Sequence, residues 1–250
     1  MNILVTAGNT QVPIDRVRCL TNVFTGRTGG GIALHGHDRG HAVTLLTSHP
    51  EAVADLREHA PPADARWRLY PYRTFDDLQE RMGALVRGGG FDVIVHSAAV
   101  SDYRAAGIYA PAAGTRFRAE VGSWEADGGG AARLEDRAAG KVKSDEPELW
   151  LRLVRAPKIV DQIRAEWGFA GVLVKFKLEV GVREERLLEV AEKSRRVSAA
   201  DLMVANTLEG AHEWAFLGPV EGGYQRVSRR ELAARLLEAV EQKHREKAHG

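Results

Sequence analysis

Residues 2–10 read NILVTAGNT, an apolar run from Asn2 to Thr6 followed by the turn-forming residues Ala7-Gly8-Asn9. A short apolar run that ends in glycine and asparagine predicts a buried strand that enters a turn. Similar runs occur at residues 42–47 (AVTLLT) and 92–97 (DVIVHS), with helical periodicity over residues 75–87 between them. Strands that alternate with helices predict a parallel sheet with right-handed crossovers. We therefore expect an α/β protein, a Rossmann-like three-layer fold with a mainly parallel sheet.

The rest of the chain extends this pattern, with one interruption. Further strands are expected over residues 67–70, 149–154, 172–176 and 202–205, and a weaker β pair over residues 214–217 and 224–227. Further helices are expected from residues 29–31 to 39–40, over residues 51–59, from Pro157 onward, over residues 184–197 and over residues 229–246. Residues 105–140 mix glycine, proline, alanine and charge without periodicity. We expect them to form an irregular insertion, a lid or a dimer arm, within a single α/β domain spanning residues 1–250.

The composition excludes several classes of protein. With 250 residues and 44% hydrophobic content, the chain can bury a sizeable core. Its 35 Lys and Arg against 34 Asp and Glu give a net charge of +1, so we expect neither nucleic acid nor membrane as a partner. No stretch approaches the roughly 18 consecutive apolar residues that cross a bilayer, and Met1 leads directly into a strand without a targeting segment. These features and the single cysteine, Cys19, predict a cytoplasmic protein without an internal disulfide.

Unusual side chains follow the predicted strands, at the positions where open parallel sheets bind ligands. Residues 21–31 (TNVFTGRTGGG) place hydroxyls, glycines and Arg27 just before a helix, which suits a phosphate; a purely structural loop is the alternative. Ala98 and Ala99 follow the strand at 92–97 and could let a ring or ribose lie against the backbone, and Asp102 could bind a sugar hydroxyl, a base amine or a metal. Asp102 and Arg104 could equally form a surface pair. Lys141 and Lys143 could attract a polyphosphate or simply be solvated.

Two other chemistries lack support in the sequence. His37 and His41 are four residues apart, but Gly40 is expected to end the helix between them and no third ligand stands at zinc-enzyme spacing. We therefore predict no metal-ligating residues. The chain also lacks a G-x-S-x-G nucleophile elbow. The side chains quoted above therefore include no convincing nucleophile triad.

Seven segments, in order along nearly the whole chain, resemble the phosphopantothenate–cysteine ligase family, the phosphopantothenoylcysteine synthetases. They are Val5–Thr10 with Pro13-Ile14-Asp15 and Val17-Arg18; Thr21-Asn22 with Thr25-Gly26-Arg27 and Gly29; Ala98–Tyr103; Lys141-Val142-Lys143; Ala156–Val160; Phe176–Glu179; and Asp201–Asn206.

The resemblance implies a two-step reaction in coenzyme A biosynthesis. ATP or CTP as co-substrate, with Mg²⁺, would activate the carboxylate of 4'-phosphopantothenate as an acyl-nucleotide with loss of pyrophosphate. The amine of L-cysteine would then attack the acyl carbon, giving phosphopantothenoylcysteine. The resemblance also implies a homodimer. Many bacteria fuse the ligase behind a flavin-dependent decarboxylase, and the 250-residue length predicts a free-standing ligase without that partner.

Site residues are carried over from the family one by one. Asn22 matches the asparagine that handles the acyl-nucleotide and binds phosphopantothenate, and Lys141 matches the first lysine of a Lys-x-Lys-Lys motif that would stabilise charge on the phosphates. These two are the expected catalytic residues. The expected nucleotide-binding residues are Gly8, Ser97, Ala98, Asp102, Lys141, Pro157, Lys158, Ile159, Val160, Phe176 and Lys193. The expected substrate-binding residues are Asn22, Thr25, Gly26, Arg27 and Ala99.

Departures from the family keep alternatives open. The lysine motif reads Lys141-Val142-Lys143-Ser144, the usual Gly-Lys reads Gly26-Arg27, and the insertion at 105–140 is longer than in bacterial relatives. Phe176–Glu179 is closer to eukaryotic and archaeal relatives, which leaves CTP or ATP open. One alternative is a nucleotide-binding module of the same fold without turnover. The other is an NAD(P)-dependent reductase, which would need a G-x-G-x-x-G turn and an acidic residue after the second strand; neither is present.

Overall fold

The computed structural model describes residues 1–56 and 62–249, and the chain divides into two compact units. Unit 1 consists of Met1–Thr10, Asn22–Val100 and Lys158–Gly250. Unit 2 consists of Gln11–Thr21 and Ser101–Pro157. That both make up one α/β domain, as the sequence suggests, stays a prediction.

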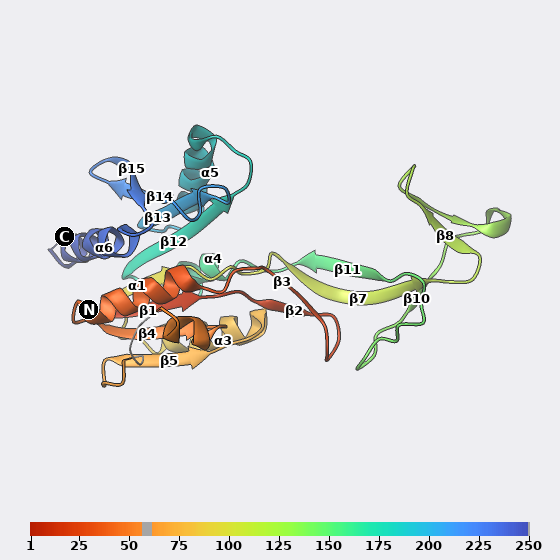
Figure 1. Cartoon of the computed structure of the whole chain (residues 1–250), viewed down its shortest axis with the longest axis horizontal. Coiled ribbons are helices and arrows are strands. Elements are labelled where there is room, and N and C mark those ends of the chain that lie inside the picture. The colour runs from red at the N-terminus through yellow and green to blue at the C-terminus, as the bar shows by residue number, and fades with distance from the viewer. Residues whose placement is uncertain (57–61, 250) are drawn as a thin grey trace. The chain divides into compact units, whose positions relative to one another are not determined.

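Unit 1 is built on an eight-stranded sheet with the order β15-β14-β13-β12-β6-β1-β4-β5 (Figure 1). Its strands are β1 (Asn2–Ala7), β4 (Ala42–Thr47), β5 (Trp67–Pro71), β6 (Val93–His96), β12 (Val172–Glu179), β13 (Leu202–Thr207), β14 (Trp214–Val220) and β15 (Gly223–Ser228). The strands from β5 across to β13 pair in parallel, and β14 and β15 add an antiparallel edge. This confirms the expected mainly parallel sheet.

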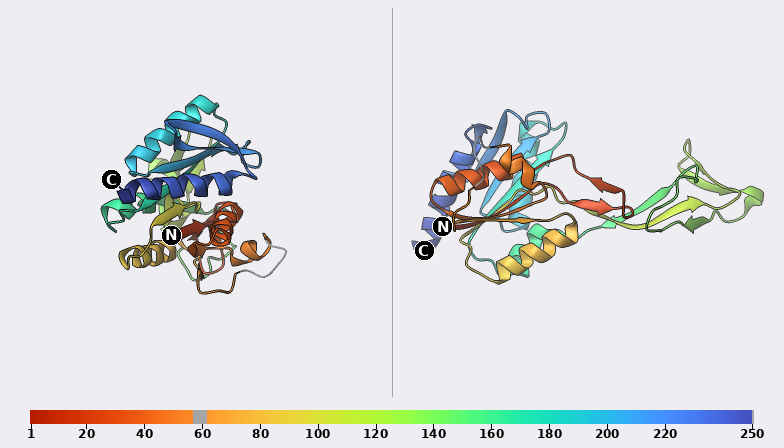
Figure 2. Two further views of the ribbon diagram at one scale, coloured as in Figure 1. Left: turned by 90° about the vertical axis from the view of Figure 1, so that its left-hand side faces the viewer. Right: turned by 60° about the horizontal axis from the view of Figure 1, so that its bottom comes forward.

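Helices cover both faces of this sheet, which completes three layers (Figure 2). They are α1 (Arg27–Asp38), α2 (Pro50–Ala54), α3 (Phe75–Arg87), α4 (Ile159–Ala165), α5 (Glu184–Val197) and α6 (Leu232–His249). One set of alternating strand residues, such as Val5 and Val174, packs with α1 and α6 in one core. The opposite set, such as Met203 and Ala205, packs under α5. Because side chains alternate along a strand, the two cores lie on opposite faces.

Local sequence explains why several elements begin and end where they do. The Thr74 hydroxyl accepts a hydrogen bond from the Asp77 amide (3.2 Å), and the Asp77 carboxylate accepts one from the Thr74 amide (2.8 Å). This capping box starts α3 at the expected residue. Gly40, with φ of +91°, follows α1 in the left-handed conformation that glycine adopts without strain.

Unit 2 is built mainly of β-strands, so the expectation of irregular structure at residues 105–140 is wrong, whereas their role as a lid or dimer arm stays a prediction. The expected irregular insertion at 105–140 contains regular strands that pair in antiparallel fashion. The elements of unit 2 are β2 (Gln11–Pro13), β3 (Cys19–Thr21), β7 (Tyr103–Pro111), β8 (Thr115–Arg118), β9 (Ser123–Ala126), the short 3₁₀ helix η1 (Asp127–Gly129), β10 (Leu134–Asp136) and β11 (Trp150–Arg155). Most of their residues are exposed or only half-buried, so the alternation that marks a strand covered on one face is weak.

Smaller differences concern the ends of elements. The strands β12 and β13 continue to Glu179 and Thr207, beyond the expected ends at 176 and 205. α4 begins at Ile159 rather than at Pro157, and α6 begins at Leu232 rather than at 229. The helix expected over 51–59 ends at Ala54, and its expected residues 57–59 lie outside the described part of the chain. Among residues 1–56 and 62–249, none of the helices has the length and apolar character needed to cross a membrane.

Candidate functional site

The ends of β1 and β6 bring four of the expected site residues together. These strands are parallel neighbours in which Thr6 lies opposite His96, so Gly8 and Ser97–Ala99 follow at the same edge of the sheet. The Ser97 amide donates to the Thr6 carbonyl (3.2 Å), and the Ala99 amide donates to the Gly8 carbonyl (2.8 Å). We call this hydrogen-bonded surface, Gly8, Asn9 and Ser97–Ala99, the carboxyl edge.

Asn22 is attached to the carboxyl edge by its side chain and by its backbone. Its Nδ2 donates to the Ala99 carbonyl (3.0 Å), and its own carbonyl accepts a hydrogen bond from Asn9 Nδ2 (2.5 Å). Asn9 is 5% exposed, whereas Asn22 is exposed. The structure therefore places an exposed carboxamide at the carboxyl edge, on a buried support.

Thr25, Gly26 and Arg27 reach the carboxyl edge through the start of α1. A Cβ on Gly26 would lie 2.2 Å from the Gly8 nitrogen, and the φ of Gly26 is +80°, so glycine is required on both counts. No side chain caps the N-terminus of α1. Its first-turn amides and the helix dipole therefore favour an anion beside Gly8, as expected for a phosphate.

Arg229 is a further cation at the start of α1, and the sequence did not indicate it. Its Nη2 donates to Thr28 Oγ1 in the first helical turn. Burial lowers the pKa of its guanidinium. Arg229 lies between β15 and α6, far from Thr28 in the chain, so no local motif could have located it.

Phe176, Lys177 and Asn206 lie near the carboxyl ends of β12 and β13. Phe176 lies opposite Val204 and packs partly buried against the core under α1 and α6. The Lys177 ammonium pairs with the Glu179 carboxylate at 2.8 Å. Asn206 is 7% exposed, and its Nδ2 donates to the Thr207 carbonyl (3.2 Å). Lys177 and Asn206 belong to segments on which the family resemblance rests, so the sequence did carry a signal for them.

The expected nucleotide-binding residues on α4 and α5 differ in how far their side chains are exposed. Ile159 and Val160 are 1% and 7% exposed, so their side chains face the core, and only Lys158, at the N-cap of α4, is exposed. Lys193 is exposed in the C-terminal half of α5. Because α5 runs from the end of β12 back to the start of β13, the structure does not bring Lys193 to the carboxyl edge.

Asp102, Lys141 and Pro157 belong to unit 2, where all three are exposed. Between Lys141 and Lys143, Val142 is 4% exposed, and its amide donates to the carboxylate of Asp15 (3.1 Å). The Arg18 guanidinium, with hydrogen bonds from backbone amides, holds the pKa of Asp15 well below its usual range. The lysine segment is thus anchored at its central residue.

A buried polar row lies one step below the carboxyl edge, across β1, β6 and β12. Thr6 lies opposite His96, and His96 lies opposite Lys175. Thr6 Oγ1 and His96 Nδ1 are 2.9 Å apart, and Lys175 Nζ donates to Ser198 Oγ (2.7 Å). Burial and the charge of Lys175 lower the pKa of His96 to about 4. Burial lowers the pKa of Lys175 to about 8.

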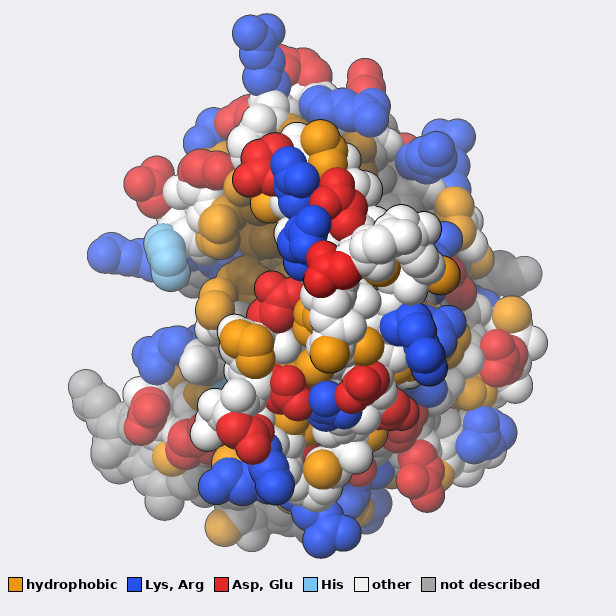
Figure 3. Space-filling view, turned by 90° about the vertical axis from the view of Figure 1, so that its right-hand side faces the viewer, with side chains coloured by type: hydrophobic (Ala, Val, Ile, Leu, Met, Phe, Trp, Pro, Cys, Tyr) orange, Lys and Arg blue, Asp and Glu red, His pale blue; other side chains and the backbone are white. Residues whose placement is uncertain are grey.

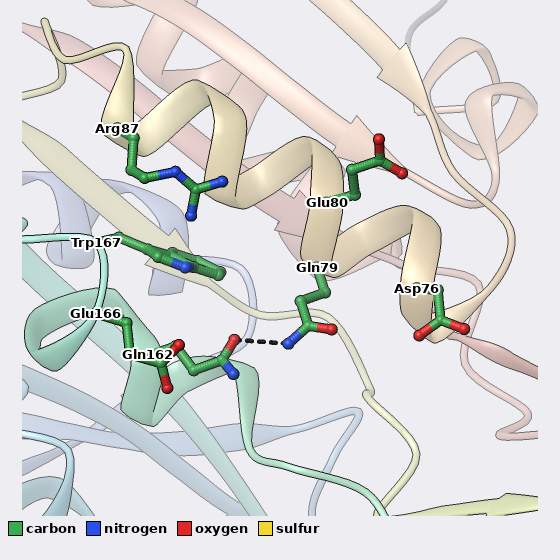
Figure 4. Close-up of a pocket in the computed structure, with 7 residues that line it drawn as sticks. All are labelled: Asp76, Gln79, Glu80, Arg87, Gln162, Glu166 and Trp167. Carbon is green, nitrogen blue, oxygen red and sulfur yellow. Dashed lines mark hydrogen bonds between the residues drawn. The ribbon is translucent and has the colours of Figure 1, made fainter.

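A separate pocket of about 360 Å³ lies between α3 and the region of α4 (Figure 4). Gln79 Nε2 donates to Gln162 Oε1 (2.9 Å) across it. Its lining residues are Asp76, Gln79, Glu80, Arg87, Gln162, Glu166 and Trp167. None of them is an expected site residue.

The possible metal ligands and the surface charges of the described residues bear on how the expected co-substrates would be held. Outside residues 57–61 and 250, no group of three or more His, Cys, Asp or Glu side chains could hold a metal ion. Mg²⁺ commonly keeps several waters and binds one or two carboxylates together with substrate phosphates. That a nucleotide brings Mg²⁺ to this chain stays an expectation from the family resemblance. On the face drawn in Figure 3, acidic and basic side chains are interspersed, in keeping with the net charge of +1.

Comparisons with known proteins agree on one family. Residues 1–111 match the family model described as DNA/pantothenate metabolism flavoprotein C-terminal domain. The chain is 31% identical over 247 residues to a coenzyme A biosynthesis bifunctional protein CoaBC of Thermococcus kodakarensis, covering 96% of this chain and 50% of that protein. It is 28% identical over 209 residues to the protein of the same name from Escherichia coli, covering 82% of this chain and 41% of that protein. The chain thus spans about half the length of the curated relatives it matches, or less.

A solved structure matches over almost its full length. The DNA/pantothenate metabolism flavoprotein from Streptococcus pneumoniae superposes with a TM-score of 0.73 at 28% identity, covering 97% of this chain and 99% of that one. Fold, family model and relatives agree with the resemblance found in the sequence. By family model, relatives and solved structure, the chain is therefore similar to proteins with the DNA/pantothenate metabolism flavoprotein C-terminal domain, in agreement with the resemblance found in its sequence.

Proposed function

We propose that the chain catalyses the ATP- or CTP-dependent ligation of 4'-phosphopantothenate with L-cysteine. The observation that carries the proposal is the attachment of the exposed Asn22 carboxamide to the Ala99 carbonyl (3.0 Å). It lies on the same sheet edge as Gly8, against which the uncapped start of α1 packs. The Asn22 amide can hydrogen-bond an acyl group, and the free amides at the start of the helix can bind a phosphate. An acyl-nucleotide intermediate contains both of these groups.

In the first proposed step, a carboxylate oxygen of phosphopantothenate attacks the α-phosphorus of the nucleotide and pyrophosphate leaves. In the second step, the cysteine nitrogen attacks the acyl carbon, loses a proton and displaces the nucleoside monophosphate. Asn22 holds the acyl group, and Lys141 stabilises charge on the phosphates in the first step. The chain supplies orientation and charge rather than a covalent intermediate.

The remaining expected residues keep proposed binding roles. Gly8, Ser97 and Ala98 present backbone groups to the nucleotide, and Thr25, Gly26 and Arg27 bind the substrate phosphate. Asp102, Pro157, Lys158 and Phe176 remain proposed nucleotide contacts; Ile159 and Val160 would act through their backbone because their side chains are buried. For Lys193 the fold offers no support at this edge. Mg²⁺ would screen the nucleotide phosphates when bound.

The direct test supplies phosphopantothenate, cysteine, Mg²⁺ and either CTP or ATP, and measures pyrophosphate and phosphopantothenoylcysteine together. A ligase releases both in equal amounts, and calorimetric titration of CTP and ATP side by side identifies the preferred nucleotide. A nucleotide-binding module would show affinity without turnover and would contradict the proposal. A nicotinamide reductase is disfavoured because Thr47-Ser48-His49, at the end of β4, lacks the acidic residue that binds the cofactor ribose.

We also propose a homodimer, by the family resemblance. Light scattering of the purified chain tests this directly: a mass of twice 27.4 kDa is expected, and a monomer at working concentration would contradict it.

A further inference from the structure

We propose that Asn9 is a positioning residue for Asn22, a role that rests on the proposed ligase function for its catalytic consequence. Asn9 is buried at the end of β1, and its side-chain amide donates to the Asn22 carbonyl (2.5 Å). Asn22 is exposed, so the hydrogen bonds that reach it from the carboxyl edge help to hold its orientation. Asn9 itself does not need to touch the substrate.

Ser48 fixes which way the Asn9 carboxamide points. The Ser48 hydroxyl donates to Asn9 Oδ1 (3.1 Å) and accepts from the Asn9 backbone amide (2.9 Å). With Oδ1 used as the acceptor, Nδ2 is the atom that faces Asn22. A carboxylate at this position would place two oxygens against each other, so the support requires an amide.

Asn9 also supports the second attachment of Asn22. It forms a parallel bridge with Ala99, the residue whose carbonyl accepts the Asn22 side chain. The backbone bonds of this bridge join Ala99 to Gly8 and Thr10, so the Asn9 side chain holds the Asn22 backbone next to the carbonyl that holds the Asn22 side chain. Positioning errors of about 1 Å can cost a reaction up to about 100-fold in rate, so loosening this support should reach the chemistry.

The kinetic test is a double-mutant cycle between Asn9→Ala and Asn22→Ala. With Asn22 present, Asn9→Ala should lower kcat for product about tenfold and leave the KM for the nucleotide within about twofold. With Asn22→Ala already present, adding Asn9→Ala should change kcat less than about twofold, because nothing remains to position. Equal losses in both backgrounds would overturn the proposal. Asn9→Asp should resemble Asn9→Ala.

Asn2 offers a matched control at the other end of β1. Its Nδ2 also donates to a backbone carbonyl, that of Gly90 (2.8 Å). Asn2→Ala therefore removes a comparable hydrogen bond from the same strand. It should leave kcat and the partition between pyrophosphate and product unchanged.

An NMR measurement keeps the proposal independent of turnover. The Asn22 side-chain amide signal is identified by its disappearance in Asn22→Ala, and its order parameter is measured in each variant. Asn9→Ala should lower that order parameter, whereas Asn2→Ala should not. Unchanged order in Asn9→Ala refutes the positioning role. Lowered order in a protein that lacks turnover with both nucleotides supports the positioning role and refutes the ligase function alone.

Discussion

The carboxylate of Asp15 accepts a hydrogen bond from the backbone amide of Val142 at 3.1 Å, although 127 residues separate them in the chain. Arg18 completes the cluster: its Nη2 donates to Asp15 Oδ2 (2.6 Å) and to the Val142 carbonyl (2.9 Å). Val142 is buried between two exposed lysines, Lys141 and Lys143. The segment that carries the proposed phosphate-stabilising lysine is therefore held by a charge-assisted cluster within unit 2.

Asp15→Asn should loosen the lysine segment without removing a lysine. The neutral amide is a weaker acceptor for Arg18 and for the Val142 amide. We expect the Val142 amide to exchange with deuterium at least about tenfold faster in the variant, as measured by NMR. Asp136→Asn, which alters an exposed carboxylate on β10, serves as the control. Unchanged protection of Val142 would show that the cluster does not hold the segment.

Lys141→Gln should abolish pyrophosphate release while the fold stays intact. The substitution keeps a polar, slightly shorter side chain but removes the charge that would oppose the developing negative charge on the phosphates. Pyrophosphate release is measured beside the far-ultraviolet circular dichroism spectrum. Lys243→Gln, at a lysine on α6 paired with Glu246 at 2.8 Å, is the control and should remain active. Near-normal release by Lys141→Gln contradicts the assigned role.

Asn22→Asp should separate the two proposed steps. A carboxylate at this position can no longer donate to the Ala99 carbonyl and repels the substrate's negative groups, so amide formation should stall after activation. Rapid quench followed by mass spectrometry should detect an acyl-nucleotide that the wild type does not accumulate. A variant that makes no product and accumulates no such intermediate would argue against Asn22 acting in the second step.

Lys175→Met should change stability in a pH-dependent way. Burial lowers the pKa of Lys175 from 10.5 to about 8, so between these values the unfolded chain binds a proton that the folded chain has released. The free energy of unfolding of the wild type should therefore rise relative to Lys175→Met as the pH increases through this window, by about 2 kcal/mol. Urea unfolding at pH 7 and pH 10 measures the difference. Lys243→Met should show no comparable pH dependence; an equal trend in both variants would refute the buried-lysine origin.

The sequence predicts those site residues that come directly after a strand. Gly8, Ser97, Ala98 and Ala99 follow β1 and β6, and parallel strands predict that they share one edge of the sheet; their closeness also needs the adjacency of β1 and β6, which the structure shows. Arg229 and the pair of Asn9 with Ser48 could not be found this way. Their roles depend on hydrogen bonds between segments that are distant in the chain, and a linear pattern does not encode such bonds.

The sequence by itself determined the α/β class and most elements of the sheet, because apolar periodicity and turn residues act within a few positions of one another. It did not reveal the strands of residues 105–140 because, apart from Ile108 and Ala110 on β7, their side chains are exposed or half-buried and alternate only weakly. The tertiary structure alone decided that Asn9 supports Asn22 and that Asp15 anchors Val142. It also decided that α5 carries Lys193 away from the edge where β1 and β6 end. These relationships follow from strand order, register and helix direction, which arise only when the whole chain packs.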